Sequence, residues 1–436
     1  MNTSSPSTST SFDSLGLSDS TLLALKKMGY EQPTPIQGKA IPLALAGKDI
    51  IGCAATGTGK TAAFVLPMVE LLAGKPGTRG LILAPTRELA LQIAEHLETF
   101  GAPLDVRGTV VMGGVSSRAQ EKALRGKPAV IIATPGRLVD HLQQKIADLS
   151  QIEILVLDEA DRMLDMGFKP QLTRILAKLP RKRQTLLFSA TVAGEVADFA
   201  KSHLSSPTRV EVTRTGTTAT RAKQDLYLVP QNDKPALLMA LLATGKETTL
   251  IFTRTKRRAD KLAKLLERGG HAVARIHADR SQAQRIEALS GFKSGKYRVL
   301  VATDIAARGI DVEEIGHVVN LDLPHVPADY VHRIGRTARA SASGLASSFV
   351  SPDEMELLVQ IEKYTRTPIP RKPVPVDAPE YLAERERARK AVSEPGRPQA
   401  GHRRSGRPAG QAPGRHARTH SNGPKVAGAG RSEHRR

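Results

Sequence analysis

The chain has 436 residues, of which 64 are Lys or Arg and 43 are Asp or Glu, so its formal net charge is +21. At roughly 100 to 200 residues per domain the length allows two or three domains, and the 40% apolar content excludes a chain that is disordered throughout. The single cysteine, Cys53, excludes a disulfide scaffold and a zinc site made of several cysteines, and the positive charge favours a polyanionic partner, nucleic acid above all.

The apolar segments are all shorter than the roughly 18 residues that a membrane span requires. Residues 1–11 are rich in Ser and Thr, and they have neither the basic start nor the apolar centre of a secretory signal. We therefore expect residues 1–11 to be disordered, and we expect no membrane attachment and a cytoplasmic location.

Short, continuous apolar runs alternate with helical stretches along most of the chain. Continuous apolar runs predict strands that are buried on both faces of a parallel sheet, with helices as the crossovers. The predicted strands of the first part of the chain are residues 49–54, 80–85, 129–134, 153–159 and 184–190.

A polar stretch at residues 214–221 interrupts this pattern, which then resumes. The predicted strands of the second part are residues 224–230, 248–253, 272–277, 298–303 and 317–322. We therefore predict two α/β domains, residues 12–213 and 222–370, joined by the linker 214–221. Their similar size and alternation suggest a duplicated fold.

Residues 371–436 have a different composition, with 16 Lys or Arg against 6 Asp or Glu. From Gly396 onward Gly, Pro, Arg and His dominate, and such a segment cannot build a core. We expect a disordered basic tail, preceded by a short charged helix at residues 381–392. An RNA-binding arm is favoured because arginine pairs with phosphate and stacks on bases; a solvated tail that only aids solubility is the alternative.

The first predicted strand leads into a glycine-rich turn at residues 54–61, AATGTGKT, which is followed by an apolar helical stretch. Glycines let backbone N–H groups surround an anion at a helix N-terminus, while the lysine supplies charge for the β- and γ-phosphates and the hydroxyl binds Mg²⁺. Ala54 replaces the first glycine of the strict pattern, so this is a variant phosphate-binding loop. The predicted nucleotide-binding residues are Thr56, Gly57, Thr58, Gly59, Lys60 and Thr61.

Two carboxylates, Asp158 and Glu159, directly follow the predicted strand at residues 153–159. Mg²⁺ bound with a nucleotide needs a carboxylate at such a strand end. We predict that Asp158 holds Mg²⁺ together with Thr61, and that Glu159 polarises the water that attacks the γ-phosphate.

The motifs, taken together and in order, resemble those of the DEAD-box RNA helicases of helicase superfamily 2, over about residues 12–355. They are GYEQPTPIQ (29–37), AATGTGKT (54–61), PTRELA (85–90), GG (113–114), TPGR (134–137), DEAD (158–161), SAT (189–191), LIFTRT (250–255), ATDIAARGID (302–311) and HRIGRTAR (332–339). The strings at 277–295 and 301–320 look most like the bacterial RhlE branch. The resemblance implies two tandem RecA-like domains that use ATP and Mg²⁺.

The resemblance also implies roles in nucleotide recognition and coupling. Gln37 is expected to read adenine, since its amide offers both a donor and an acceptor, and Phe12 is expected to stack on the base. Ser189 and Thr191 are expected to bond to Asp161 and to couple hydrolysis to RNA binding.

In the second domain, HRIGRTAR places Arg336 and Arg339 three residues apart. We expect them on one face of a helix, as arginine fingers for the γ-phosphate. By resemblance, Asp311 contacts the ribose and the fingers, and His332 links back to the DEAD motif. Ala55, Ala278 and Ala338 depart from the family pattern, and Ala338 puts the rate of hydrolysis in doubt rather than the reaction.

For RNA, the resemblance points to residues that grip the sugar-phosphate backbone, which implies little sequence specificity. Those of the first domain are Thr86, Arg87, Gly113, Gly114, Thr134, Gly136 and Arg137. Those of the second domain are Arg254 and Thr303.

The sequence therefore predicts an RNA-dependent ATPase that hydrolyses ATP to ADP and phosphate and locally unwinds or remodels RNA duplexes. Its partners would be single-stranded RNA and short duplexes, in ribosomal or RNA-decay assemblies. An ATP-gated RNA clamp or annealing factor is the first alternative, and a DNA helicase or translocase is the second.

Overall fold

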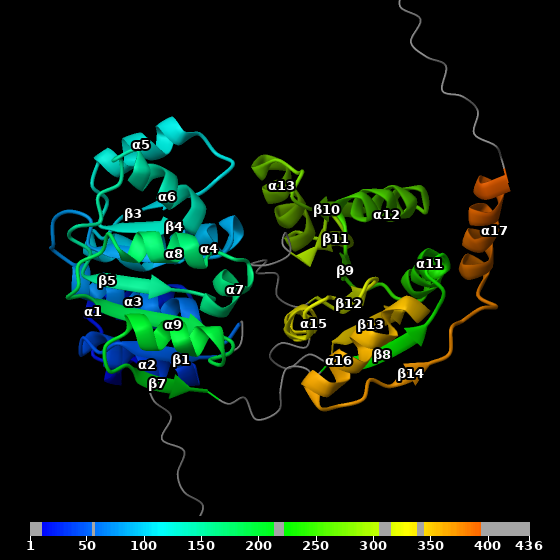
Figure 1. Ribbon diagram of the computed structural model, residues 1–436, viewed down its shortest axis with the longest axis horizontal. Coiled ribbons are helices and arrows are strands. Elements are labelled where there is room, and N and C mark those ends of the chain that lie inside the picture. The colour runs from blue at the N-terminus through cyan, green and yellow to red at the C-terminus, as the bar shows by residue number, and fades with distance from the viewer. Residues whose placement is uncertain (1–10, 55–56, 213–221, 305–314, 338–343, 394–436) are drawn as a thin grey trace, which may run out of the picture. The chain divides into compact units, whose positions relative to one another are not determined.

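The computed structural model describes residues 11–54, 57–212, 222–304, 315–337 and 344–393. The described residues up to Arg387 form a first compact unit. The predicted linker at 214–221, and the tail from residue 394 onward, lie outside the described residues. Two sheets of seven strands, all paired in parallel, define two α/β domains within the first unit (Figure 1).

The first domain alternates strands and helices along the chain (Figure 1). Its strands are β1 (Ile50–Cys53), β2 (Gly80–Leu83), β3 (Gly108–Val111), β4 (Val130–Ala133), β5 (Ile154–Leu157), β6 (Gln184–Ser189) and β7 (Thr208–Glu211). Its helices are η1 (Phe12–Ser14), α1 (Asp19–Lys27), α2 (Pro35–Leu45), α3 (Lys60–Leu72), α4 (Arg87–Gly101), η2 (Ala102–Leu104), α5 (Ser117–Arg125), α6 (Pro135–Gln143), α7 (Ala160–Asp165), α8 (Lys169–Leu176) and α9 (Glu195–His203).

The continuous apolar strands of this domain are buried on both faces, as predicted. Successive side chains of a strand point to opposite faces, and in β5 Ile154 and Val156 join one apolar cluster while Leu155 and Leu157 join another. The first cluster takes its helical members mainly from α1 to α4, and the second from α6 to α9. Helices therefore cover both faces of the sheet.

The second domain is built in the same way (Figure 1). Its strands are β8 (Lys223–Leu228), β9 (Thr249–Thr253), β10 (Val273–Ile276), β11 (Val299–Thr303), β12 (His317–Asn320), β13 (Leu345–Val350) and β14 (Arg371–Lys372). Its helices are α11 (Lys234–Thr244), α12 (Lys256–Arg268), α13 (Gln282–Lys293), α15 (Pro327–Ile334), η3 (Pro352–Glu354), α16 (Met355–Thr365) and α17 (Pro379–Ser393).

The two sheets have the same topology. The strand order is β3-β4-β2-β5-β6-β1-β7 in the first and β10-β11-β9-β12-β13-β8-β14 in the second. If each domain's strands are numbered in chain order, both sheets read 3-4-2-5-6-1-7. The predicted fold of two parallel α/β domains is confirmed, and the duplication that the alternation only suggested is evident in the strand order.

The second domain extends past the boundary predicted at residue 370. β14 pairs in parallel with β8, where Arg371 lies opposite Leu226, and it is the seventh strand of the sheet. Tyr381 on α17 is buried in the core with α11 and α12, and Arg385 forms a 3.2 Å ion pair with Asp233. Placing residues 371–387 in the tail was therefore wrong. Their composition is charged, but they contain a strand of the sheet and the buried side chain of Tyr381.

Among the described residues, no helix is both long enough and apolar enough to cross a membrane.

The docking of α17 predicts that substitutions at two neighbouring side chains affect stability unequally. Tyr381 is 2% exposed and Leu382 is 52% exposed. We expect Tyr381→Ala to lower the free energy of unfolding by about 3 kcal/mol, because it leaves a cavity in the core, and the matched variant Leu382→Ala to change it by less than about 0.5 kcal/mol. Urea denaturation of the full chain measures both, and equal losses would contradict the docking of α17.

Candidate nucleotide and RNA sites

The phosphate-binding loop joins β1 to α3. Gly57 and Gly59 have φ angles of +76° and +86°, which L side chains rarely adopt, and Gly59 is the N-cap of α3. Lys60 is the first residue of this helix and is 7% exposed, and its Nζ has no hydrogen-bond partner among the described residues. A buried ammonium without a partner is costly, so this loop fits an anion such as a nucleotide phosphate. Thr56 lies outside the described residues.

Gln37 binds the loop through its side-chain amide. Its Oε1 accepts a 2.9 Å hydrogen bond from the Thr34 N–H, and its Nε2 donates a 3.1 Å bond to the Gly59 carbonyl. The first of these bonds belongs to the capping box of α2. An amide group can make four hydrogen bonds, so the predicted reading of adenine is compatible with both contacts, and the structure adds a direct link from Gln37 to the phosphate loop.

Phe12 is 5% exposed and packs edge-on against Tyr30, with the ring centroids 6.3 Å apart. This is the packing of an ordinary core residue, so its stacking on a base stays a prediction.

The two carboxylates follow β5, two strands away from β1 in the sheet. Glu159 has a φ of +50° and caps α7, and its carboxylate pairs with the Arg162 guanidinium at 2.5 Å. Burial raises the pKa of Asp158 to about 6, while Lys60 acts in the opposite direction. Burial would also raise the pKa of Glu159, but Arg162 and Lys60 outweigh it and bring that pKa to about 2.

Arg162 was missed in the sequence, although its position three residues after Glu159 on a helix was a usable signal. Together with Lys60 and Arg336, this guanidinium keeps the pKa of the buried Glu159 low, so the carboxylate is ionised at neutral pH.

The nucleotide site offers oxygen donors of the kind that Mg²⁺ binds. In the described part of the chain no group of three or more His, Cys, Asp or Glu side chains is placed to hold a metal ion. Mg²⁺ at nucleotide sites needs only one or two carboxylates, together with phosphate oxygens and water. Asp158 at the end of β5 and Thr61 in the first turn of α3 are donors of that kind.

Asp161 links the acidic motif to the segment after β6. One carboxylate oxygen accepts hydrogen bonds from the Ala190 N–H at 3.0 Å, from the Thr191 N–H at 3.1 Å and from the Thr191 hydroxyl at 3.3 Å. The Ser189 hydroxyl donates instead to the Thr191 carbonyl at 2.5 Å. The expected bond from Thr191 to Asp161 is present, while the expected bond from Ser189 was wrong, because Ser189 closes its own turn.

His332 lines a small pocket with residues of the nucleotide site. The other lining residues are Lys60, Glu159, Asp161, Arg162 and Ala190. His332 was expected to link back to the DEAD motif, and in this structure the two share a pocket.

The helical placement predicted for Arg336 was wrong. α15 ends at Ile334 with Gly335 as its C-cap, so Arg336 lies in the turn that follows, and it is buried. Its positive charge contributes to the low pKa of Glu159. Arg339, Ala338 and Asp311 lie outside the described residues.

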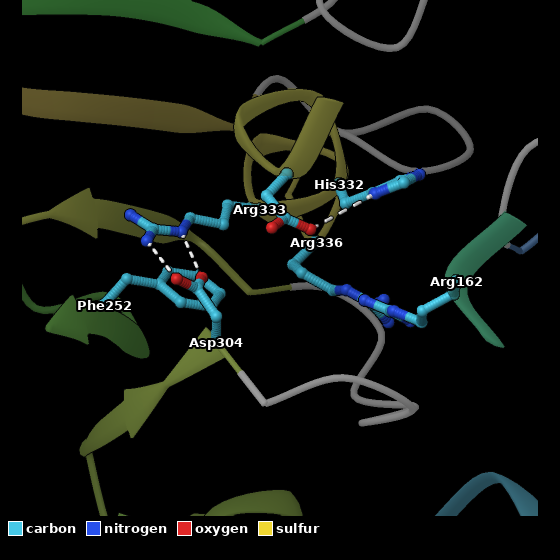
Figure 2. Close-up of a pocket in the computed structure, with 7 residues that line it drawn as sticks. Arg162, Phe252, Asp304, His332, Arg333 and Arg336 are labelled. Atoms are coloured by element: carbon cyan, nitrogen blue, oxygen red, sulfur yellow. Dashed lines mark hydrogen bonds and ion pairs between the residues drawn. The ribbon is translucent and has the colours of Figure 1, made fainter. Parts of the chain in front are cut away.

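Arg333 and Asp304 form a pair that the sequence did not reveal. The Arg333 guanidinium binds both carboxylate oxygens of Asp304, at 2.6 and 2.7 Å, and stacks over the Phe252 ring (Figure 2). It also donates to the Asn320 side chain and to the Asp322 carbonyl. This one buried side chain therefore joins β11, β12 and α15, and it fixes the helix that carries His332.

The first-domain RNA candidates all follow the carboxyl ends of three neighbouring strands, β3, β4 and β2. Thr86 caps α4 after β2, where its hydroxyl accepts a bond from the Leu89 N–H, and Thr134 caps α6 after β4, next to Gly136 and Arg137. Gly113 and Gly114 follow β3, and the Arg87 guanidinium lies where side chains at these glycines would stand. The structure thus brings these candidates to one half of the sheet edge.

The second-domain candidates occupy the equivalent half. Arg254 follows β9 and Thr303 ends β11, and both strands belong to the group β10-β11-β9. The Arg254 side chain is 34% exposed and pairs with Glu354 at 2.7 Å.

Comparison with known proteins identifies the same family that the sequence motifs resemble. The DEAD/DEAH box helicase family matches residues 34–199, and the helicase conserved C-terminal domain matches residues 233–341. The DEAD-box ATP-dependent RNA helicase CshA of Geobacillus kaustophilus is 44% identical over 371 residues, which is 84% of this chain and 79% of that protein. The ATP-dependent rRNA helicase rrp3 of Aspergillus niger is 46% identical over 81% of this chain and 77% of that protein.

Among solved structures, Dbp5 of S. cerevisiae bound to RNA and ADP BeF3 is similar, with a TM-score of 0.76 and 32% identity. The similarity covers 88% of this chain and 99% of that one.

The contact of Gln37 with the loop leaves no room for a side chain at Gly59. A Cβ at Gly59 would clash with Gln37 Nε2, whereas Gly74, which also has a positive φ of +70°, has open space around it. Both Gly→Ala variants cost about 1 kcal/mol in backbone strain. We expect Gly59→Ala to weaken the binding of a fluorescent ATP analogue at least tenfold and Gly74→Ala to leave it unchanged; equal affinities would contradict this role of the loop.

Proposed function

This chain belongs to the DEAD-box family of ATP-dependent RNA helicases, and from that membership we propose how its own residues perform the activity. The observation that carries the proposal is the buried, unpartnered Lys60 ammonium beside the ionised Glu159, among the residues that the structure describes. A cation that needs an anion and a carboxylate that can polarise water are what the hydrolysis of a phosphoanhydride requires. ATP is hydrolysed to ADP and phosphate, and bound RNA is locally unwound.

In this proposal Lys60 and the backbone N–H groups of residues 57–61 hold the phosphates, and Gln37 selects adenine. Mg²⁺, when bound, neutralises charge on the phosphates, and Asp158 and Thr61 hold it. Glu159 orients and polarises the attacking water, and Arg162 keeps Glu159 ionised. Arg336 and Arg339 stabilise the charge that develops on the γ-phosphate.

Coupling between the nucleotide and RNA is assigned to Asp161, Thr191 and His332. Asp161 binds the segment after β6 through Ala190 and Thr191. Because the same short α7 carries both Asp161 and Arg162, and Glu159 is its N-cap, a shift of the segment at Thr191 is transmitted to the catalytic carboxylate. Ser189 supports this segment by bonding to the Thr191 carbonyl.

The topology supports the RNA assignment. In the first sheet the phosphate-binding loop follows β1 and the carboxylates Asp158 and Glu159 follow β5, whereas all seven RNA candidates follow β3, β4 and β2. In the second sheet Arg254 and Thr303 follow the equivalent strands β9 and β11. Contacts to the backbone from helix N-termini, glycines and arginines would give little sequence specificity.

We also propose a cytoplasmic location, membership of the RhlE branch, and targets in ribosomal or RNA-decay assemblies. The relative from Aspergillus niger is named an rRNA helicase, which favours ribosomal RNA among these targets.

Steady-state ATP hydrolysis tests the proposal. We expect single-stranded RNA to stimulate hydrolysis at least tenfold, DNA of equal length to stimulate it weakly, and GTP to be a poor substrate. Lys60→Ala and Glu159→Gln should each reduce the RNA-stimulated rate about 100-fold or more, because each removes a group that acts in the transition state. Equal stimulation by DNA would indicate a DNA translocase, and hydrolysis without unwinding of a short duplex would indicate a clamp or annealing factor.

The basic tail is proposed to bind RNA phosphates. Deletion of residues 396–436 should make the plot of log K against log salt shallower, by about 0.7 for each phosphate that the tail neutralises in the full chain. The rate of ATP hydrolysis without RNA is the control and should not change. An unchanged salt dependence of RNA binding would show that the tail acts in solubility alone.

A further inference from the structure

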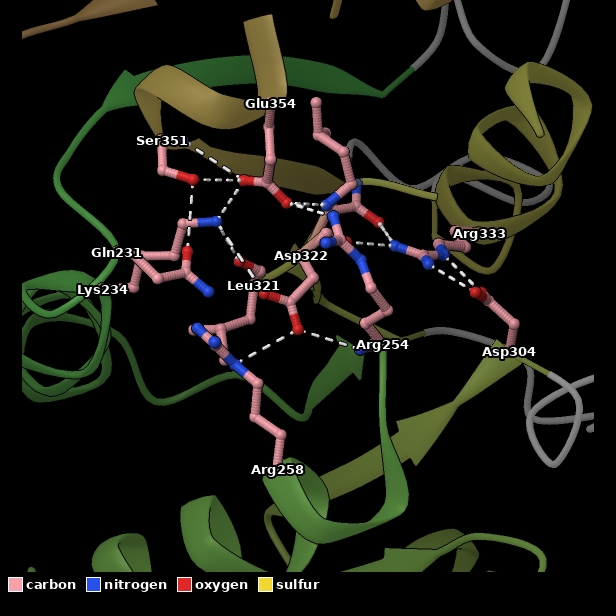
Figure 3. A network of polar contacts seen from close by, with 12 residues as sticks. Gln231, Lys234, Arg254, Arg258, Asp304, Leu321, Asp322, Arg333, Ser351 and Glu354 are labelled. Atoms are coloured by element: carbon pink, nitrogen blue, oxygen red, sulfur yellow. Dashed lines mark hydrogen bonds and ion pairs between the residues drawn. The ribbon is translucent and has the colours of Figure 1, made fainter. Parts of the chain in front are cut away.

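Two partly exposed arginines of the second domain are held by one buried set of charges. Arg254 donates to a Glu354 oxygen at 2.7 Å through Nη2, and Arg258 pairs with an Asp322 oxygen at 3.2 Å through Nε (Figure 3). That same Asp322 oxygen accepts a 2.9 Å bond from the Arg254 N–H. The two guanidinium groups are therefore positioned from a common scaffold at the carboxyl end of β9.

The scaffold itself is inaccessible to solvent. Asp322 and Glu354 are each 1% exposed, and Lys234 is fully buried. Lys234 Nζ contacts Glu354, donates a 2.9 Å bond to the Leu321 carbonyl and lies 3.9 Å from Asp322. Glu354 also accepts bonds from the Ser351 hydroxyl at 3.0 Å and from the Leu323 N–H at 3.2 Å. A buried carboxylate with so many partners has no freedom to move.

The charges of this cluster do not cancel. Glu354 and Asp322 supply two negative charges, of which the buried Lys234 neutralises one. Arg254 and Arg258 supply two positive charges at the surface, so the cluster presents a net positive charge to solvent.

Both arginines keep donors for a ligand. Their side chains are 34% and 27% exposed, and in the described part of the chain each guanidinium uses one nitrogen for the scaffold. A guanidinium has five N–H groups in a planar fork that suits phosphate oxygens. The remaining donors of the pair are therefore available to an anion.

The duplicated topology indicates which anion this is. α4 follows β2 in the first domain, and α12 follows β9 in the second, with the two strands at equivalent places in their sheets. The caps of these helices, Thr86 and Thr255, have nearly the same backbone angles (φ −129° and ψ 156° against φ −128° and ψ 149°). The turn at Thr255 is therefore the counterpart of the turn at Thr86, which is assigned to RNA binding in the first domain, and Arg258 lies three residues after Thr255.

We infer that Arg254 and Arg258 together form a binding site for RNA backbone phosphate, and that Glu354 and Asp322 are positioning residues that hold the two guanidinium groups in place. This inference rests on the proposed RNA-binding function and adds Arg258 and the buried scaffold to it. Lys234 keeps the two carboxylates from neutralising the pair.

Equilibrium binding of a fluorescein-labelled single-stranded RNA to the full chain, with a non-hydrolysable ATP analogue present, tests the site. Arg258→Gln should raise the Kd for RNA about tenfold and make the salt dependence shallower by about 0.7, with the KM for ATP unchanged. Arg371→Gln is the matched control, because Arg371 is also a partly exposed arginine of this domain paired with a glutamate, Glu362. It should leave both quantities unchanged.

The positioning role is tested by a double-mutant cycle. Glu354→Gln should weaken RNA binding about fivefold in the wild-type background and not at all in the Arg254→Gln background, because the glutamate then has no guanidinium to hold. Loss of stability alone would weaken binding equally in both backgrounds. If Glu354→Gln does not fold, Arg258→Gln still decides the site, since that side chain lies at the surface.

The outcomes separate this inference from the function on which it rests. If RNA stimulates ATP hydrolysis by the wild type but Arg258→Gln binds RNA with unchanged Kd and salt dependence, the arginine pair is not an RNA site and the inference fails alone. If Arg258→Gln raises the KM for ATP and spares the Kd for RNA, the pair binds nucleotide phosphate and the inference is also wrong. If RNA neither binds nor stimulates the wild type, the proposed function fails first.

Discussion

The nucleotide site depends on the buried ammonium group of Lys60. It lies among buried carboxylates, and no described residue gives its Nζ a hydrogen bond. Glu159 pairs with Arg162, and burial raises the pKa of Asp158 although Lys60 and the Glu159 N–H act in the opposite direction. The Lys60 ammonium is thus left without a hydrogen-bond acceptor at the N-terminus of α3, where the helix dipole also favours an anion. A nucleotide phosphate bound there can supply that acceptor.

The parallel sheets explain why so many functional residues meet. Carboxyl ends of parallel strands lie along one edge, so residues that are far apart in sequence are collected there. The order 3-4-2-5-6-1-7 in each domain divides that edge into two halves. In the first domain the half with β1, β5 and β6 holds the nucleotide residues, and the half with β3, β4 and β2 holds the RNA candidates. The second sheet shows the same division into two halves. Within the nucleotide half of the first sheet, Asp161, which follows β5, is hydrogen-bonded to the segment that follows β6.

The sequence predicted the central strands well, because runs such as Ile154–Leu157 are continuous and fully buried. It missed β3, β7, β13 and β14, which are partly exposed, polar or very short, as in Arg371–Lys372. It placed Arg336 on a helix, but Gly335 ends α15 one residue earlier. The scaffold of Lys234 and Glu354 could not be read from local spacing, since 120 residues separate its two members. Gln37 was assigned to adenine without its bond to Gly59, which only tertiary structure reveals.

The proposed function requires that the nucleotide bound at the site controls the affinity for RNA. The most direct measurement is the affinity of the full chain for one single-stranded RNA at fixed salt, without nucleotide, with ADP, and with a non-hydrolysable ATP analogue. The account predicts that the ATP analogue lowers the Kd at least tenfold, which is about 1.4 kcal/mol of coupling, and that ADP does not. Equal affinity in all three conditions would contradict it.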